Sequence, residues 1–122
     1  MDEKKILIVD DELSMLHLLE SWLEPHYRVL KACDGEEGFK VASAEMPDLI
    51  LLDILMPKVD GRQMLKHLKM TAATHDIPVV IMTAIGDTSS ITQAQDMGAV
   101  DYLIKPLKLQ ELSEVVKKYI WR

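Results

Sequence analysis

The sequence predicts an α/β protein in three layers, with a five-stranded parallel sheet between two layers of helices. Short apolar runs alternate about five times with segments whose apolar residues recur at helical spacing. Repeated strand–helix units favour a parallel sheet with helices on both faces, because each crossover is right-handed. No linker-like stretch divides the 122 residues, so we expect one domain over residues 1–122.

The first half of the chain supplies two of the predicted strands and two helices. Residues 5–9 are a mostly aliphatic run that stops at two acids. Leu16, Leu19 and Leu23 share one face of a helix predicted over residues 13–24, which Pro25 would end. The predicted second strand, residues 27–32, shows partial alternation. The second predicted helix covers residues 35–44, with Asp34 as its N-cap.

The central strand is the clearest element of the prediction. Residues 49–53 form a continuous apolar run that ends on Asp53, which is typical of a strand covered on both faces. Pro57 cannot donate a hydrogen bond to a ladder, so the strand should stop near Asp53. Asp60-Gly61 is a turn signal, and a third helix is predicted over residues 62–70.

The last part of the chain completes the alternation. Residues 77–83 form a predicted strand that ends on a threonine, and Pro78 is tolerated near its start. Gly98 should stop a helix predicted over residues 87–97. The remaining predicted elements are a strand over residues 100–104 and an amphipathic closing helix over residues 109–120.

Composition narrows the function classes. The net charge of −6 argues against a protein that binds the phosphate backbone of nucleic acids. No apolar run reaches the roughly 18 residues of a membrane helix, and the N-terminal residues do not resemble a secretory signal. Cys33 is the single cysteine, so a disulfide within the chain is excluded. We therefore expect a cytoplasmic protein that contacts neither membranes nor nucleic acid directly.

Four predicted strands end on residues with the chemistry of phosphoryl transfer: Asp10 and Asp11, Asp53, Thr83, and Lys105. Parallel strands bring these ends to one edge of the sheet. Three carboxylates favour a hard dication such as Mg²⁺, while a lysine and a threonine suit a phosphoryl group. Asp53, on the central strand, is the best candidate nucleophile, because aspartate forms acyl-phosphates in covalent phosphoryl transfer.

This constellation resembles the receiver domain of bacterial two-component response regulators. Val9-Asp10-Asp11, Asp53 before Met56-Pro57 and Asp60-Gly61, Thr83-Ala84, and Lys105-Pro106 carry the resemblance, which covers residues 4 to about 119. It implies a flavodoxin-like, doubly wound sheet of order 2-1-3-4-5. It also implies that Asp53 accepts phosphate from a sensor histidine kinase or a histidine phosphotransfer protein, with Mg²⁺ held by Asp10, Asp11, Asp53 and the backbone carbonyl of Leu55.

The resemblance further implies a switch. The Thr83 hydroxyl would move toward the phosphoryl group, and Tyr102 would turn inward; simple strand packing is the less favoured alternative for Tyr102. The surface that reads this out would be the helix from Asp87, the last strand and the closing helix. That surface could contact a downstream protein target, serve a fused output domain or pair two copies of the chain.

We also expect two further sets of residues to affect docking of the phosphodonor and loss of the phosphate. Leu13, Ser14, His17 and Leu107 should flank the acidic pocket and suit docking of a helical phosphodonor. Leu55 and Ile85 flank the water path in the family and cannot orient a water, so we expect slow loss of phosphate and no true enzymatic turnover.

Two other function classes remain. A receiver-shaped module that never takes phosphate is disfavoured by the intact set of site residues. An aspartyl phosphatase would need a second acid two residues after the nucleophile, and position 55 is leucine. Labelling by a small phosphodonor tests the first, and turnover of a phosphomonoester tests the second.

Overall fold

Five parallel strands form one sheet in the order β2-β1-β3-β4-β5. The computed structural model of the chain describes residues 3–54, 56, 61–84 and 88–121. The strands within these ranges are β1 (Lys5–Val9), β2 (Arg28–Ala32), β3 (Leu49–Asp53), β4 (Val79–Ala84) and β5 (Asp101–Lys105). The predicted doubly wound sheet of order 2-1-3-4-5 is therefore confirmed.

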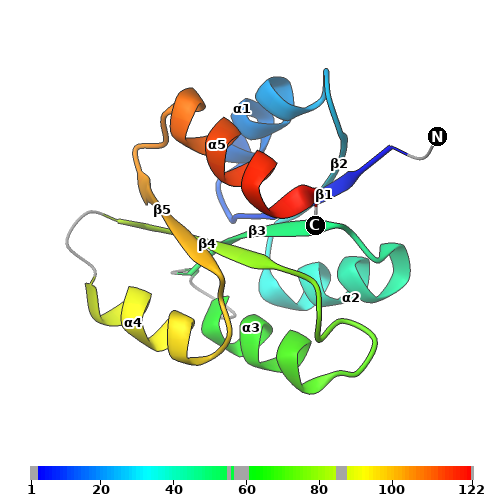
Figure 1. Cartoon of the computed structure of the whole chain (residues 1–122), viewed down its shortest axis with the longest axis vertical. Helices are drawn as coiled ribbons and strands as arrows, with labels where there is room; N and C mark the ends of the chain where they lie inside the picture. Colours follow the sequence, from blue (N-terminus) through cyan, green and yellow to red (C-terminus); the bar gives the residue numbers. More distant parts are fainter. Residues whose placement is uncertain (1–2, 55, 57–60, 85–87, 122) are drawn as a thin grey trace.

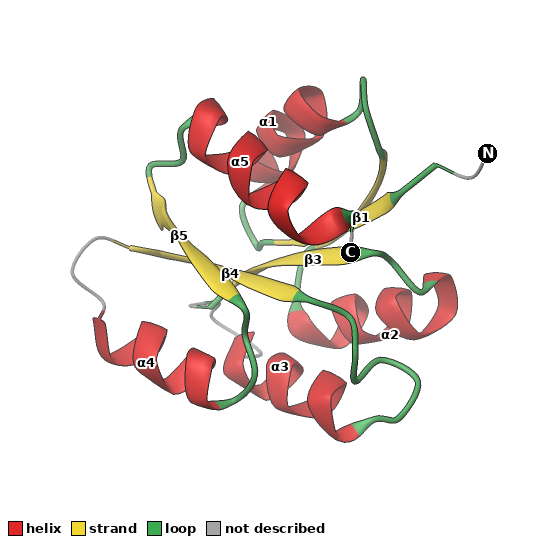
Figure 2. Cartoon of the chain, in the orientation of Figure 1, coloured by secondary structure: helices red, strands yellow, loops and turns green. Residues whose placement is uncertain are grey.

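Helices cover both faces of the sheet, as the alternation of elements predicted (Figures 1 and 2). Helices α1 and α5 lie on one face, while α2, α3 and α4 lie on the other. Their bounds are α1 (Leu13–Leu23), α2 (Gly35–Glu45), α3 (Gly61–Met70), α4 (Thr88–Asp96) and α5 (Leu109–Ile120). Among the described residues, no helix combines the length and the apolar character needed to cross a membrane.

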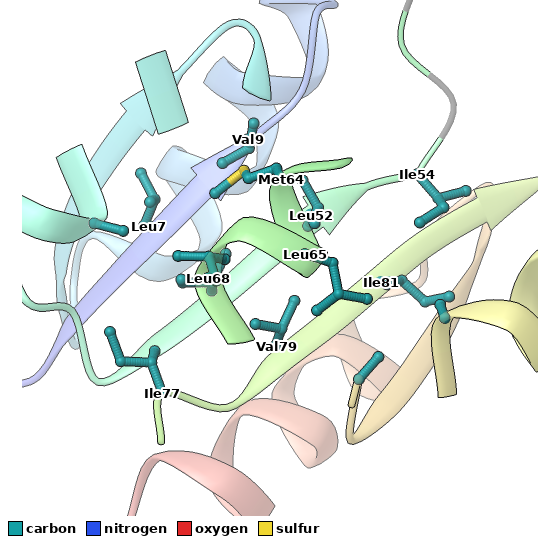
Figure 3. Close-up of a cluster of buried hydrophobic side chains, with 14 of the residues drawn as sticks. Leu7, Val9, Leu52, Ile54, Met64, Leu65, Leu68, Ile77, Val79 and Ile81 are labelled. Atoms are coloured by element: carbon teal, nitrogen blue, oxygen red, sulfur yellow. The ribbon is translucent and has the colours of Figure 1, made fainter. Parts of the chain in front are cut away.

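Two hydrophobic cores result from the alternation of side chains along the strands. Ile50 and Leu52 of β3 join the core beneath α2 and α3, together with Leu65 of α3 (Figure 3). Leu49 and Leu51 point the other way, into the core beneath α1 and α5. Every residue of β3 is buried, which explains its unbroken apolar run.

Local chemistry fixes the ends of two helices. The Asp34 carboxylate accepts a hydrogen bond from the Glu37 backbone N–H at 2.8 Å, which confirms the predicted N-cap of α2. Helix α4 ends at Asp96, and Gly98 follows with φ of +107°, a conformation that glycine adopts without strain. The Ala99 N–H then donates to the Ala94 carbonyl at 2.9 Å and closes the turn.

Strands β2, β4 and β5 begin later than the apolar pattern indicated, and β5 starts at Asp101 instead of residue 100. Strand β4 starts at Val79 instead of residue 77, because the Ile77 N–H donates to the Thr74 carbonyl and holds Ile77 in a turn. Strand β2 starts at Arg28, because the Tyr27 N–H donates to the Leu23 carbonyl at the end of α1. In both cases a local turn hydrogen bond competes with the ladder, and the side-chain pattern does not reveal it.

Candidate functional site

The carboxyl ends of β1, β3, β4 and β5 meet at one edge of the sheet. Asp10 directly follows β1, Asp53 is the last residue of β3, and Lys105 is the last residue of β5. Thr83 is the next-to-last residue of β4 and pairs in register with Ile104. The structure thus brings together residues that are up to 95 positions apart in the sequence.

The Lys105 ammonium joins two buried carboxylates. Its Nζ donates a hydrogen bond to Asp10 Oδ2 at 3.0 Å and lies 3.4 Å from Asp53 Oδ2. Asp10 is fully buried, and Asp53 is 5% exposed. Buried carboxylates need compensating charge, because leaving water is costly for an ion. Lys105 is therefore a fixed positive charge beside the side chain of Asp53.

The protonation state of Lys105 is firmly set. Burial of the ammonium lowers its pKa, but the hydrogen bond to Asp10 and the charges of Asp53 and Asp10 together outweigh burial. The net effect raises the pKa of Lys105 above its ordinary value of 10.5. The side chain consequently stays cationic at physiological pH and can bind an anionic ligand.

Glu12 belongs to the site, although the sequence did not single it out. Its backbone N–H donates to Asp10 Oδ1 at 3.0 Å, and its carboxylate Oε1 lies 3.9 Å from Lys105 Nζ. Both oxygens of Asp10 therefore have protein partners, one in Glu12 and one in Lys105. The signal available in the sequence was the position of Glu12 directly after the acid pair.

The three predicted acids converge closely enough to hold a metal ion. Asp10, Asp11 and Asp53 each offer a carboxylate oxygen, and these oxygens lie within 4.8 Å of one another. Asp11 is exposed, so one side of the cluster faces solvent. Three carboxylates and one ammonium leave an excess of negative charge, and hard oxygen ligands with an open side suit Mg²⁺. Leu55, predicted to add a backbone carbonyl, lies outside the described residues, as does Ile85.

Gly61 presses the start of α3 against the end of β3. A Cβ at this position would lie 2.8 Å from Ile54 Cα and closer still to the carbonyl oxygen of Asp53. The Gly61 N–H also donates to the Ile54 carbonyl at 3.0 Å. The sequence indicated a turn and part of the family motif here, whereas the structure shows that the absent side chain lets helix α3 approach the backbone of Asp53.

The two predicted switch residues lie on the same face of neighbouring strands. Thr83 is 1% exposed, and Tyr102 is 38% exposed. Tyr102 pairs in register with Ile81, two residues before Thr83, so Tyr102 and Thr83 are diagonal neighbours. Tyr102 therefore lies between solvent and β4, the strand that carries Thr83.

The predicted docking residues surround the same edge. Leu13, Ser14 and His17 are all exposed on the first turns of α1, and the exposed fraction of Leu13 is 65%. Leu107 follows the cis peptide bond between Lys105 and Pro106 and packs half-buried against the core beneath α1 and α5. The exposed residues of α1 can thus contact a partner, whereas Leu107 is partly buried because it packs against the core.

Comparison with known proteins gives concordant results. Residues 6–117 match the family model described as "Response regulator receiver domain". The chain is 37% identical to "Probable transcriptional regulator ycf27" of Cyanophora paradoxa, covering 100% of this chain and 50% of the relative. It is 36% identical to "Sporulation initiation phosphotransferase F" of Bacillus subtilis, covering 98% of this chain and 96% of that protein.

A solved structure shares the whole fold. The crystal structure of a putative response regulator from Chloroflexus aurantiacus superposes with a TM-score of 0.93 at 34% sequence identity, covering 99% of this chain and 100% of that one. The chain spans about half the length of the first curated relatives that it matches.

Proposed function

Because this chain belongs to the family of response regulator receiver domains, we propose that Asp53 is the residue that accepts the phosphoryl group. Receiver domains of two-component systems are phosphoacceptors, not true enzymes, and interact with histidine kinases or phosphotransfer proteins. The observation that carries the proposal is the position of the Lys105 ammonium, 3.4 Å from the Asp53 carboxylate and 3.0 Å from that of Asp10.

In the proposed reaction, a carboxylate oxygen of Asp53 attacks phosphorus in line. The new bond joins that oxygen to phosphorus, and the bond from phosphorus to the donor imidazole nitrogen breaks. The nitrogen keeps the electron pair of the broken bond. Lys105 balances charge on the phosphoryl oxygens, and Thr83 donates a hydrogen bond from its hydroxyl.

The acid cluster fits a magnesium ion. Asp10, Asp11 and Asp53 would hold it, with the backbone carbonyl of Leu55 as a further ligand. When bound, Mg²⁺ supplies positive charge for the phosphoryl oxygens. Since both oxygens of Asp10 already have protein partners, the exposed Asp11 is the acid with most freedom to adjust to the ion.

A matched pair of variants tests the phosphoacceptor. With acetyl phosphate and Mg²⁺, intact-protein mass spectrometry should show the addition of one phosphoryl group, and Asp53→Asn should abolish it. Asp48→Asn is the control, because Asp48 lies just before the same strand at the opposite edge of the sheet. Labelling of Asp53→Asn at the unaltered rate would overturn the assignment, and no labelling of the parent chain would favour a receiver-shaped module that never takes phosphate.

The docking surface for the donor is part of the same proposal. Leu13, Ser14, His17 and Leu107 lie around the edge that holds Asp53, where a helical donor must approach to present its histidine. Replacing Leu13 by aspartate should slow phosphorylation by a kinase or phosphotransfer protein without slowing phosphorylation by acetyl phosphate. A cytoplasmic location fits such donors.

Output would follow from the two neighbours Thr83 and Tyr102. Phosphate on Asp53 would attract the Thr83 hydroxyl, and Tyr102 would turn into the space released. The face formed by α4, β5 and α5 would then bind a downstream protein, a fused output domain or a second copy. Fluorine NMR of fluorotyrosine-labelled chain, with Tyr102→Phe to assign the signal, would detect this motion.

Slow loss of phosphate completes the proposal. Leu55 and Ile85 carry no group that could hydrogen-bond an attacking water. If the combined variant Leu55→Asn with Ile85→Glu leaves the lifetime of the acyl-phosphate unchanged, another feature controls access of water.

A further inference from the structure

A groove lies between α5 and the end of α1. Both helices cover the sheet face opposite to α2, α3 and α4 (Figure 1). The volume of the groove is about 1020 Å³, compared with about 290 Å³ for the hollow between α2 and α3. It is lined from Leu109 near the start of α5 to Trp121 just beyond its end, and by the last turn of α1. The α5 side of the groove therefore runs the length of that helix, whereas the opposite side is confined to the end of α1 and the segment that follows it.

The groove presents large apolar side chains to solvent. Leu109 is 52% exposed and Trp121 is 65% exposed, one at each end of the groove. Trp22 and Tyr27 form the α1 side and are only partly buried. Both tryptophans of the chain therefore lie here. Aromatic residues gathered around an open groove are typical of a surface that binds another protein.

The charges of the groove are of opposite sign and free to pair with another molecule. Glu114 and Lys117 are both exposed and both line the groove. Among the described residues neither takes part in an ion pair, and Glu114 only accepts a hydrogen bond from Gln110 at 3.4 Å. A partner that offers a base to Glu114 and an acid to Lys117 would complement both charges.

The spacing along α5 identifies that partner. The midpoint of positions 109 and 121 is 115, and the midpoint of positions 114 and 117 is 115.5. A twofold axis near Val115, with two copies of α5 antiparallel, would place Leu109 of each copy against Trp121 of the other. The same axis would place Glu114 of each copy against Lys117 of the other. One symmetry operation satisfies both the apolar ends and the charges.

We propose that two copies of this chain associate through the α1–α5 groove, in an isologous contact with antiparallel α5 helices. The contact is distinct from pairing through α4, β5 and α5, because it uses α1 and lies over the opposite sheet face from α4. Trp22, Tyr27 and Trp121 lie toward the edge of the sheet away from Asp53. The aromatic end of the contact therefore lies away from the acidic cluster, while Leu109 lies two residues after Leu107 of the proposed donor-docking surface.

Reversing the charges of Glu114 and Lys117 should give a set of results that only a twofold contact predicts. Sedimentation equilibrium of the 122-residue chain should show a dimer. Glu114→Lys or Lys117→Glu should each raise its dissociation constant about tenfold or more, since each creates two like-charge contacts. The double variant should restore the dimer. An equimolar mixture of the two single variants should restore it as well, because one copy would then present two bases at these positions and the other copy two acids.

Controls separate this contact from other surfaces. Glu36→Lys and Lys40→Glu reverse an equally exposed pair on α2 and should leave association unchanged. Fluorescence of Trp22 and Trp121 should depend on protein concentration in the parent chain and not in the single variants of α5. A chain that stays monomeric at its highest soluble concentration overturns the proposal. A dimer that Ile104→Ser on β5 disrupts, or that the double variant fails to restore, also overturns it. None of these outcomes bears on the assignment of Asp53 as phosphoacceptor, because labelling by acetyl phosphate tests that assignment separately.

Discussion

At the scale of single residues, one ammonium group balances two opposing requirements. Lys105 neutralises the buried carboxylates of Asp10 and Asp53, and it also repels any dication that those carboxylates attract. A phosphoryl group resolves the conflict, because its oxygens can bind the lysine and a metal ion together. Lys105 should therefore weaken binding of the metal and yet be required for the reaction.

Lys105→Met separates these two effects. The variant keeps an apolar stem of similar length and loses the charge. We expect the affinity for Mg²⁺, measured by calorimetric titration, to rise several-fold, because a repelling cation is removed. The rate of labelling by acetyl phosphate should fall about a hundredfold or more, since a preorganised donor to the transition state is lost. Weaker Mg²⁺ binding in this variant would show that Lys105 chiefly holds the acids in position.

Gly61 offers a second prediction at this scale. Gly61→Ala places a methyl group against the backbone of Asp53 and Ile54, which cannot move without shifting the strand end. We expect a loss of about 1–3 kcal/mol in the free energy of unfolding and slower phosphorylation. Gly38→Ala is the comparison, because its Cβ would meet the side-chain atoms Met64 Sδ and Val9 Cγ2, each at 2.9 Å, whereas the nearest atoms to Gly61 belong to the backbone. Urea unfolding of both variants should rank Gly61→Ala as the more damaging.

The sequence revealed the site residues that stand at strand ends, because a strand end is visible as the last residue of an apolar run. Asp10, Asp53 and Lys105 were found in this way, and the structure brings them together. Glu12 was not found, and Gly61 was named only as part of a turn and of the family motif, without its packing role. Their roles depend on a backbone N–H and on a missing side chain, and both become visible only when distant segments pack.

At the scale of elements, a tyrosine connects α5 to the edge strand. Tyr119 Oη donates to Asp101 Oδ2 at 2.9 Å and to the Val100 carbonyl at 3.2 Å. Partial burial, followed by the hydrogen bond to Asp101, raises the pKa of Tyr119 above 10.0. The protonated phenol is the form that binds, so the folded state holds this proton more tightly than the unfolded state does.

The stability of the fold should therefore decrease at high pH, as Tyr119 ionises. The contribution of Tyr119 to stability is fully present below its unfolded pKa, near 10, and is lost as the pH rises through its higher folded pKa. Tyr119→Phe should lower the free energy of unfolding at neutral pH by about 0.5–1 kcal/mol. Absorbance titration of phenolate should show that the variant lacks a tyrosine that ionises above pH 10 in the parent chain. If the two titration curves do not differ above pH 10, the link to Asp101 is weaker than the geometry indicates.

Element identity was predictable from periodicity, but the exact starts of β2, β4 and β5 were not. Ile77 and Tyr27 continue the apolar pattern of their strands, yet each donates its N–H to a preceding turn. Side-chain pattern reports which face of an element is buried, whereas the start of a strand is decided by backbone hydrogen bonds.

At the scale of the whole molecule, the parallel sheet and its two helical layers followed from the alternation of elements, but the order of the strands did not. Periodicity alone leaves the position of β2 open. The order came from a resemblance carried by a few residues at strand ends, and the pairing of β1 with both β2 and β3 confirms it. The α1–α5 groove could not be predicted, because it depends on how far apart two helices settle on the same face.

Metal binding at the acid cluster should couple to the stability of the whole fold. Bringing Asp10, Asp11 and Asp53 together costs electrostatic repulsion, which a bound dication would relieve. Mg²⁺ should therefore raise the melting temperature, with about 2.7 kcal/mol of stabilisation at a hundred times its dissociation constant.

Asp11→Asn should change the stability in opposite directions in the absence and in the presence of Mg²⁺. Without metal it should raise stability by a few tenths of a kcal/mol, because one repelling charge is removed from an exposed position. With Mg²⁺ it should lose most of the added stability. Thermal unfolding of both chains in EDTA and in Mg²⁺ measures all four values, and curves that respond equally to Mg²⁺ would place the ion elsewhere.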